Sequence, residues 1–376
     1  MIDLISNQEL EANGVDPERL HALYKHIQSH IDSGLYPGAA VALARHGKLL
    51  AKESFGLARL PEGDAPAVMA NDETLWLLYS QTKPLTAAAI WVLLERGVIG
   101  VHDPVSLYLK NFNRNQKENV TIYHLLTHQA GFPNAVVPTS VWRNNELIDD
   151  AVCNFELEWE PGSRVHYHAS SAHWVLAAIM NAVTGEDYRR FIYKVVLEPL
   201  KLSGIWMGVP DNIKHKVCGA YERTESGEHV VLKDFAGDDF RRAGAPGSGG
   251  FARPQDMAMF YQCLLGLCGS KTIVSRATMR YVTSSQTGDR IDEFFGIPMN
   301  RGLGVHVRGH TPVTRGLGTM ASPSTFGHGG MGTSYSWADP ESGVSFSYIT
   351  NSRLSEPAHS LRLDRIAALA QSAIVK

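Results

Sequence analysis

The chain has 376 residues, of which 44% are hydrophobic and 19% are charged, and its formal net charge at pH 7 is −3. This composition is typical of a globular protein with two or three domains, and so weak a charge predicts no nucleic-acid partner. No apolar run reaches the roughly 18 residues of a membrane span, and residues 1–9 lack the features of a signal peptide. We therefore expect no membrane partner and a cytoplasmic location.

The cysteine positions support the same location. The four cysteines form no C-x-x-C pair and lie in apolar segments. They are Cys153, Cys218, Cys263 and Cys268. We interpret them as buried, reduced thiols rather than disulfides.

The first predicted elements are a helix and a two-stranded hairpin. Asp16 and Pro17 are typical of a helix N-cap and first turn, and Gly34 ends the apolar positions that follow at helical spacing. A continuously apolar run over 39–44 predicts a strand buried on both faces, with a second strand over 49–55.

The middle of the chain is mostly helical in pattern, with long loops between the helices. Pro199 is expected to end one of these helices. Helices are predicted over 121–128, 170–185, 188–197 and 255–267.

Near residue 300 the hydrophobic period changes from that of a helix to that of a strand. Residues 302–307 are strand-like, and 334–337 and 344–348 alternate apolar with polar residues on either side of a turn. A last helix is predicted over 355–374.

Strands at both chain ends and helices between them predict an α+β fold. The expected arrangement is an antiparallel sheet built from both ends and flanked by helices, with an inserted, mostly helical domain. We place the sheet domain at 1–75 and 300–376, and the mostly helical domain with the nucleophile helix at 76–299.

The stretch LYSQTKPLT, residues 78–86, predicts a nucleophile beside its base. Lys83 follows Ser80 by three residues, and residues three apart share one face of a helix. Pro84 suits the first turn of the apolar helix that follows, and the positive end of the helix dipole favours an alkoxide at Ser80. An S-x-x-K pair also arises by chance in a chain of this length, so the surrounding sequence must show whether this pair is catalytic.

Two later stretches supply that context: EPGSRVHYHASS over 160–171, which contains Tyr167, and FGHGGMGT over 326–333. Together with the S-x-x-K pair, they resemble the serine β-lactamase and penicillin-binding protein superfamily. The resemblance covers nearly the whole chain. It is closest to the class C-like branch, and in particular to β-lactamase-related carboxylesterases. It implies a β-lactamase/transpeptidase-like fold, a serine hydrolase that needs no cofactor and no metal, and a small-molecule ester or amide substrate.

The resemblance also implies a role for each residue. Ser80 attacks a carbonyl carbon and forms an acyl-enzyme, Lys83 is the base, and Tyr167 shuttles the proton. We expect burial to push Lys83 towards neutrality and the nearby ammonium to lower the pKa of Tyr167. The backbone N–H groups of Ser80 and Met331 would form the oxyanion hole. The substrate-binding residues would be His328, Gly329 and Gly330.

Two departures from the β-lactamase pattern indicate the substrate. Ala169 stands where β-lactamases have an asparagine that binds the substrate amide, and His328 stands where they have the lysine that holds the lactam carboxylate. Histidine is mostly neutral at pH 7. We therefore favour ester hydrolysis. The alternatives are a class C-like β-lactamase, a D-amino-acid peptidase or acyltransferase using the same residues, and a catalytically silent binding or scaffold relative.

Two other sequence patterns are weaker evidence of function. Residues 327–332 fit G-x-G-x-x-G, but a strand rather than a helix is predicted to follow, which argues against a dinucleotide site. His124 and His128 are four residues apart on a predicted helix, as in some metal sites, yet no carboxylate or cysteine follows at metal-site spacing. We expect packing roles for both. The sequence makes no prediction of oligomeric state.

Overall fold

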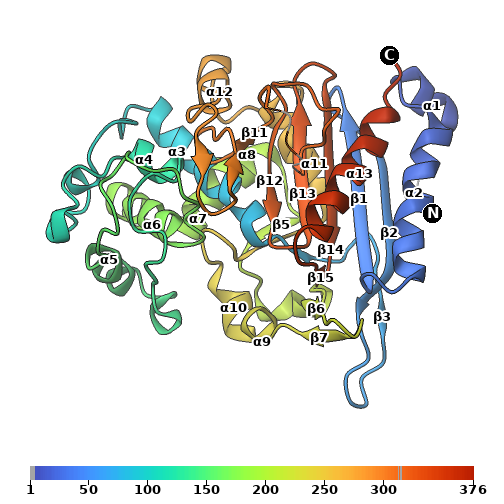
Figure 1. The fold of residues 1–376 in the computed structure, drawn as a ribbon, viewed down its shortest axis with the longest axis horizontal. Helices are drawn as coiled ribbons and strands as arrows, with labels where there is room; N and C mark the ends of the chain where they lie inside the picture. The colour runs from blue at the N-terminus through green and yellow to red at the C-terminus, as the bar shows by residue number, and fades with distance from the viewer. Residues whose placement is uncertain (1–4, 312, 314–315) are drawn as a thin grey trace.

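The computed structural model describes residues 5–311, 313 and 316–376, which form a sheet region and a mostly helical region (Figure 1). The main sheet has seven strands in the order β11-β12-β13-β14-β1-β2-β3, and all neighbouring strands are antiparallel. The strands from the N-terminal end are β1 (Gly38–Arg45), β2 (Lys48–Arg59) and β3 (Val68–Met69). Those from the C-terminal end are β11 (His306–Val307), β12 (Phe326–Gly330), β13 (Ser334–Asp339) and β14 (Val344–Thr350).

Strand β1 joins the two chain ends, since it pairs with β14 on one side and β2 on the other. Its odd residues Val41 and Leu43 pack with the helices α2 (Pro17–Asp32) and α13 (Ala358–Ser372). Its even residues Ala42 and Ala44 pack against Ala258 of α11 (Pro254–Leu264) on the opposite face. Small side chains on that face let α11 approach closely. The predicted sheet, built from both ends and covered by helices, is thus confirmed; its division from a separate helical domain stays a prediction.

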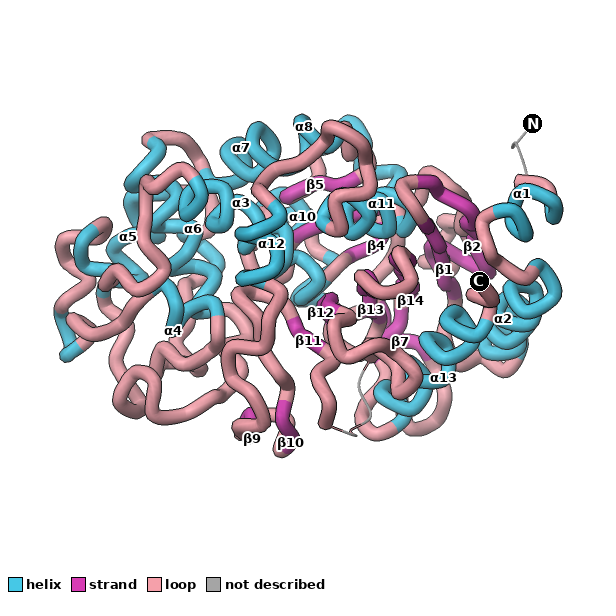
Figure 2. Tube along the Cα trace, turned by 90° about the horizontal axis from the view of Figure 1, so that it is seen from above, coloured by secondary structure: helices cyan, strands magenta, loops and turns pink. Residues whose placement is uncertain are grey.

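Helix α3 (Lys83–Glu95) is the centre of the helical region. Every residue from Lys83 to Leu93 is buried, which explains its unbroken apolar sequence. It packs against α6 (Ser171–Thr184), and Figure 2 shows the helices around α6 gathered at the end of the molecule opposite α2. The other helices and turns are α1 (Asn7–Ala12), η2 (Val105–Leu107), η3 (Arg114–Gln116), α4 (Ile122–Leu126), η4 (Thr139–Val141), α5 (Asn145–Cys153), η6 (Asp211–Lys216), α9 (Lys233–Ala236), α10 (Asp238–Ala243) and α12 (Arg276–Val282).

Short strands form three further small sheets. One contains β4 (Trp76–Leu77), β8 (Gly250–Ala252) and β5 (Ile205–Met207); a second contains β15 (Ser352–Arg353), β6 (Tyr221–Arg223) and β7 (His229–Val231); the third pairs β9 (Ile291–Asp292) with β10 (Ile297–Pro298).

Two predicted elements have different boundaries. The helix expected to stop before Pro199 continues: α7 (Tyr188–Ile192) widens into a π-helical turn, η5 (Tyr193–Leu197), and α8 (Glu198–Leu200) follows. Pro199 is the second residue of α8 and directly follows the π-helical turn, so the helix widens just before the proline instead of ending there. The strand expected over 302–307 is restricted to β11, because Gly304 adopts a left-handed φ of +86° that interrupts extended backbone.

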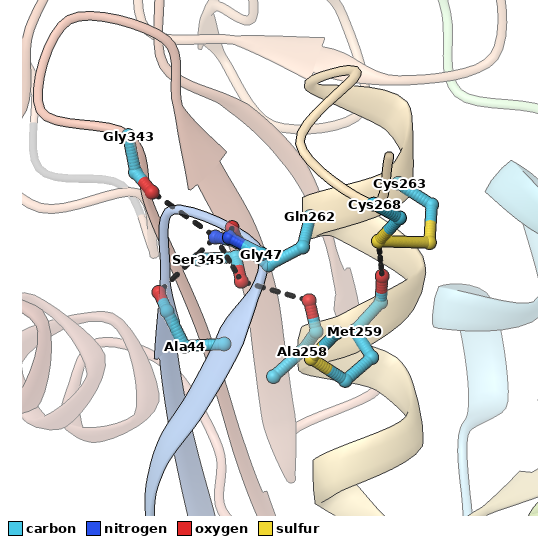
Figure 3. The surroundings of a disulfide bond; sticks show 9 residues. All are labelled: Ala44, Gly47, Ala258, Met259, Gln262, Cys263, Cys268, Gly343 and Ser345. Atoms are coloured by element: carbon cyan, nitrogen blue, oxygen red, sulfur yellow. Dashed lines mark hydrogen bonds between the residues drawn. A yellow bond between two sulfur atoms is a disulfide. The ribbon is translucent and has the colours of Figure 1, made fainter. Parts of the chain in front are cut away.

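The cysteine prediction is wrong for one pair. Cys263 and Cys268 form a disulfide with their Cα atoms 4.8 Å apart (Figure 3), because α11 ends at Leu264 and Gly266, with φ +75°, turns the chain back. Cys153 and Cys218 are buried free thiols, as expected. The disulfide removes the support that reduced thiols lent to a cytoplasmic location, which stays a prediction. Among the helices of the described residues, none combines the length and apolar character that crossing a membrane requires.

Gln262, next to this disulfide, ties two hairpin turns to α11 (Figure 3). Its buried amide nitrogen donates to Ala44 O at 3.1 Å, Gly343 O at 3.1 Å and Ser345 Oγ at 3.0 Å, and its oxygen accepts from Gly47 N at 2.7 Å. The turns of β1–β2 and β13–β14 are therefore held to one helix by a single side chain.

Candidate active site

Ser80 lies in a 3₁₀ turn, η1 (Tyr79–Thr82), that leads directly into α3. The α-helix thus begins at Lys83, and Ser80 lies in the 3₁₀ turn before it rather than in the helix itself. In a 3₁₀ turn residues three apart are eclipsed, so Ser80 and Lys83 still share one face. Pro84 lies in the first turn of α3, as predicted.

Lys83 is fully buried beside the candidate nucleophile. Its Nζ lies 3.2 Å from Ser80 Oγ, 2.8 Å from Ala169 O and 2.9 Å from Gly247 O. Burial, and secondly the charge of Arg301, lowers the pKa of Lys83 from 10.5 to about 7. A neutral amine has two N–H donors and one lone pair. The two carbonyl oxygens can take both donors, which leaves the lone pair for the proton of Ser80.

Tyr167 lies beside Ser80 and Lys83, and these three residues are the catalytic trio that the sequence predicts. The ring centroid of Tyr167 lies 5.0 Å from Lys83 Nζ, and its hydroxyl is close enough to Ser80 for that side chain to lower the Tyr167 pKa. Burial raises the pKa of Tyr167 to about 12, although Ser80 and Arg301 act in the opposite direction. The expectation that a nearby ammonium would lower this pKa is therefore wrong, because burial has the larger effect. Near neutral pH, Tyr167 is a phenol that can donate its proton.

Buried histidines line the surroundings of the trio. The ring of His128 lies 4.7 Å from that of Tyr167, and the ring of His328 lies 6.3 Å from it. Burial lowers the pKa of each well below 6.5, as it also does for His173 of α6, and it lowers the pKa of His168 to about 3. The site is therefore surrounded by uncharged imidazoles.

The two histidines considered as a metal pair have other roles. His124 Nδ1 accepts the N–H of Thr121 and completes a capping box at the start of α4. His128 Nδ1 accepts the N–H of His168 at 3.0 Å. The described part of the chain contains no group of three or more His, Cys, Asp or Glu residues arranged to hold a metal ion.

The glycine-rich triplet lies against the turn that carries Ser80. A Cβ on Gly330, the last residue of β12, would come 2.7 Å from the carbonyl oxygen of Leu78. Only glycine therefore allows β12 to approach the backbone that precedes the nucleophile. This packing brings the segments of Ser80 and Met331 together, and their N–H groups as an oxyanion hole stay a prediction, as does substrate binding by 328–330.

Sequence reasoning missed an ion pair behind Tyr167. Asp292 and Arg301 have exposed side-chain fractions of 0% and 1%, and Asp292 Oδ1 accepts the backbone N–H of Tyr167 at 3.2 Å. Both residues come from the segment 285–301, which shows no periodic pattern, so only the tertiary structure reveals the pair.

Comparison with known proteins identifies the family. The Beta-lactamase family model matches residues 23–371. The chain belongs to the Beta-lactamase family. Its fold is the β-lactamase/transpeptidase-like fold that the motifs predicted, and it is a member of a serine hydrolase superfamily whose relatives include esterases and carboxypeptidases.

Three proteins that are similar to this Beta-lactamase family member have different described activities. A putative D-alanyl-D-alanine carboxypeptidase of Escherichia coli O157:H7 is 25% identical, over 93% of this chain and 86% of the relative. The esterase/beta-lactamase LipL of Mycobacterium tuberculosis is 26% identical, over 74% of this chain and 70% of LipL. The solved structure of a family VIII carboxylesterase has a TM-score of 0.80 at 22% identity, covering 95% of this chain and 99% of that one.

Proposed function

We propose that the protein hydrolyses carboxylic esters of small molecules through an acyl-enzyme on Ser80. The neutral amine of Lys83 takes the proton of Ser80 Oγ, which attacks the ester carbonyl carbon. The oxyanion is stabilised by the N–H groups of Ser80 and Met331, a contribution of about 3 kcal/mol each. Tyr167 gives its proton to the departing alkoxide and regains one from the ammonium of Lys83. Water then attacks the acyl-enzyme with the same groups acting in reverse, which releases the acid.

The observation that carries this proposal is the uncharged His328 in the lysine position of the triplet. His328 is 2% exposed and burial lowers its pKa, so it offers no positive charge to a substrate carboxylate. Ala169 presents a methyl group and uses its carbonyl oxygen to hold Lys83. Arg353 contacts Met331 Sδ at 3.7 Å, but it pairs with Glu222, so its charge is compensated. An uncharged ester suits such a site better than a lactam carboxylate.

The rim of the site supports an apolar substrate. Phe294 and Phe295 are 56% and 41% exposed, and their rings lie 5.7 and 5.5 Å from that of Tyr167. Exposed aromatic rings beside a proton-shuttling phenol can contact an apolar acyl or alcohol group.

A direct comparison of two substrates tests the proposal. We expect fast turnover of a p-nitrophenyl short-chain ester and slow turnover of a chromogenic cephalosporin. Intact-mass measurement should show the acyl adduct on the wild type and none on Ser80→Ala. Fast cephalosporin turnover with negligible ester turnover would favour the β-lactamase or peptidase alternative. Ester products appearing only when an alcohol acceptor is added would favour an acyltransferase, and absence of labelling by a fluorophosphonate would favour a silent scaffold.

A further inference from the structure

The ion pair of Asp292 and Arg301 connects directly to the phenol side of the site. Arg301 Nε donates to Asp292 Oδ2 at 2.9 Å, and Arg301 Nη2 donates to the same oxygen. The other carboxylate oxygen accepts the N–H groups of Tyr167 at 3.2 Å and Phe294 at 3.0 Å. Asp292 therefore holds the backbone of Tyr167 with one oxygen and orients Arg301 with the other.

Arg301 and Lys83 are two basic side chains that share one aromatic ring. The Arg301 Cζ lies 5.1 Å from the centroid of the Tyr167 ring, and Lys83 Nζ lies 5.0 Å from the same centroid. The backbone of Arg301 is also fixed, since its N–H donates to Thr287 Oγ1 at 2.9 Å and its carbonyl oxygen accepts from Gln286 N at 2.7 Å. An arginine stays charged at all accessible pH values, and a fixed positive charge nearby disfavours a second one.

The other titratable groups around Lys83 are uncharged. His128 follows α4, His173 belongs to α6 and His328 belongs to β12, and burial lowers the pKa of each well below 6.5. Each of them interacts electrostatically with Lys83 when charged, but near neutral pH none carries a charge. Of the groups described around Lys83, the charges that persist are those of Arg301 and its partner Asp292.

We propose that Asp292 and Arg301 are a positioning pair: Asp292 fixes the backbone of Tyr167, and Arg301, which Asp292 orients, keeps Lys83 uncharged for its role as base. This inference rests on the proposed function, in which Lys83 takes the proton of Ser80. A merely structural ion pair would affect catalysis equally at all pH values. A positioning charge shifts the pH at which the enzyme becomes active.

The test measures the pH dependence of two reactions, kcat/KM for a p-nitrophenyl ester and the rate at which a fluorophosphonate labels Ser80. In the double variant Asp292→Asn/Arg301→Met, which leaves no buried charge unpaired, we expect the rising limb of both profiles to move to higher pH by about half a unit or more. Asp292→Asn alone keeps an acceptor for Tyr167 N–H and leaves the charge of Arg301 uncompensated. The rising limb of the pH profile of this single variant should therefore move to lower pH.

Two further variants separate charge from packing. Arg301→Lys retains the charge, so its limb should stay near that of the wild type while kcat falls. Arg290→Met is the matched control, because Arg290 is an exposed arginine of the same segment that bonds Gln129 and Gly162 O rather than the trio. Its profile should equal that of the wild type.

The outcomes are distinguishable. A double variant that melts near the wild-type temperature and loses activity with an unmoved limb overturns the inference. If the double variant does not fold, the inference is tested by Asp292→Asn: a rising limb of its pH profile that moves to lower pH supports the inference, and one that does not overturns it. A wild type that turns over no ester but is labelled at Ser80 contradicts the proposed function alone, and the labelling profiles still test the inference. A wild type that is unlabelled at every pH overturns both.

Discussion

Burial acts on Lys83 and Tyr167 in the same direction, towards the uncharged form, and this gives the two residues different chemical roles. It lowers the pKa of the amine to about 7 and raises that of the phenol to about 12. At neutral pH the amine can accept a proton and the phenol can donate one. The two backbone carbonyls of Ala169 and Gly247 then aim the lone pair of the amine at Ser80.

At the scale of the residue, we expect kcat/KM for an ester to rise with pH through a midpoint near 7. Below this pH, Lys83 is an ammonium and cannot take the proton of Ser80; above it, the amine is free. Lys83→Arg keeps a positive charge but cannot be deprotonated, so it should lose about 10²–10⁴-fold in kcat/KM at every pH. A Lys83→Arg variant that retains wild-type activity would exclude Lys83 as the base. Stopped-assay rates between pH 5 and 9 provide the measurement.

At the scale of the element, the site depends on the contact between β12 and the turn η1. Gly330 ends the strand where the carbonyl oxygen of Leu78 leaves no space for a side chain. Tyr79, the first residue of the turn, has a φ of +47°, which is uncommon for a residue with a Cβ. The surrounding packing therefore determines the backbone conformation that presents Ser80.

Gly330→Ala is expected to separate these two elements. The added methyl would meet Leu78 O at 2.7 Å and Ser334 Oγ at 2.4 Å, so the backbone must shift, at a cost of about 1–3 kcal/mol in the free energy of unfolding. The shift should also reduce the rate of Ser80 labelling. Gly237→Ala is the matched control, because Gly237 has a φ of −71° and its nearest neighbour would be 3.9 Å from the new Cβ. Equal effects of both substitutions on melting and labelling would contradict the role of this contact.

At the scale of the whole molecule, folding buries several histidines in uncharged form. They lie around the site and also at the C-terminal helix, where His359 Nδ1 contacts Arg362 Nη2 at 2.9 Å. Burial lowers the pKa of both His168 and His359 from 6.5 to about 3. Between these pH values the unfolded chain binds more protons than the folded one, so the free energy of unfolding falls as the pH decreases below about 6.5.

The expected result is a melting temperature several degrees lower at pH 5 than at pH 7. Each such histidine contributes about 1.4 kcal/mol per pH unit in that range. His359→Asn keeps an acceptor for Arg362 and removes the titration, so the decrease in stability between pH 6 and 5 should be smaller by about that amount. His21→Asn, at an exposed histidine, should leave the decrease unchanged. Denaturant unfolding at each pH measures the difference, and an unchanged slope in His359→Asn would refute the argument.

The local sequence pattern was enough to predict several secondary-structure elements and the family of this protein. The hydrophobic periods predicted α2, β1, the β13–β14 hairpin and α13, since each depends on the spacing of near neighbours along the chain. The S-x-x-K spacing, with the segments of Tyr167 and His328, indicated the family that comparison confirms.

The protonation states and the contacts of the site residues were decided only by the tertiary structure. Burial by distant segments, rather than the adjacent ammonium, determines the protonation of Tyr167. The ion pair of Asp292 and Arg301 and the disulfide at the end of α11 also required the folded chain. The physical reason is that periodicity is a property of neighbouring residues, whereas burial, charge and close approach depend on segments that meet only when the chain has folded.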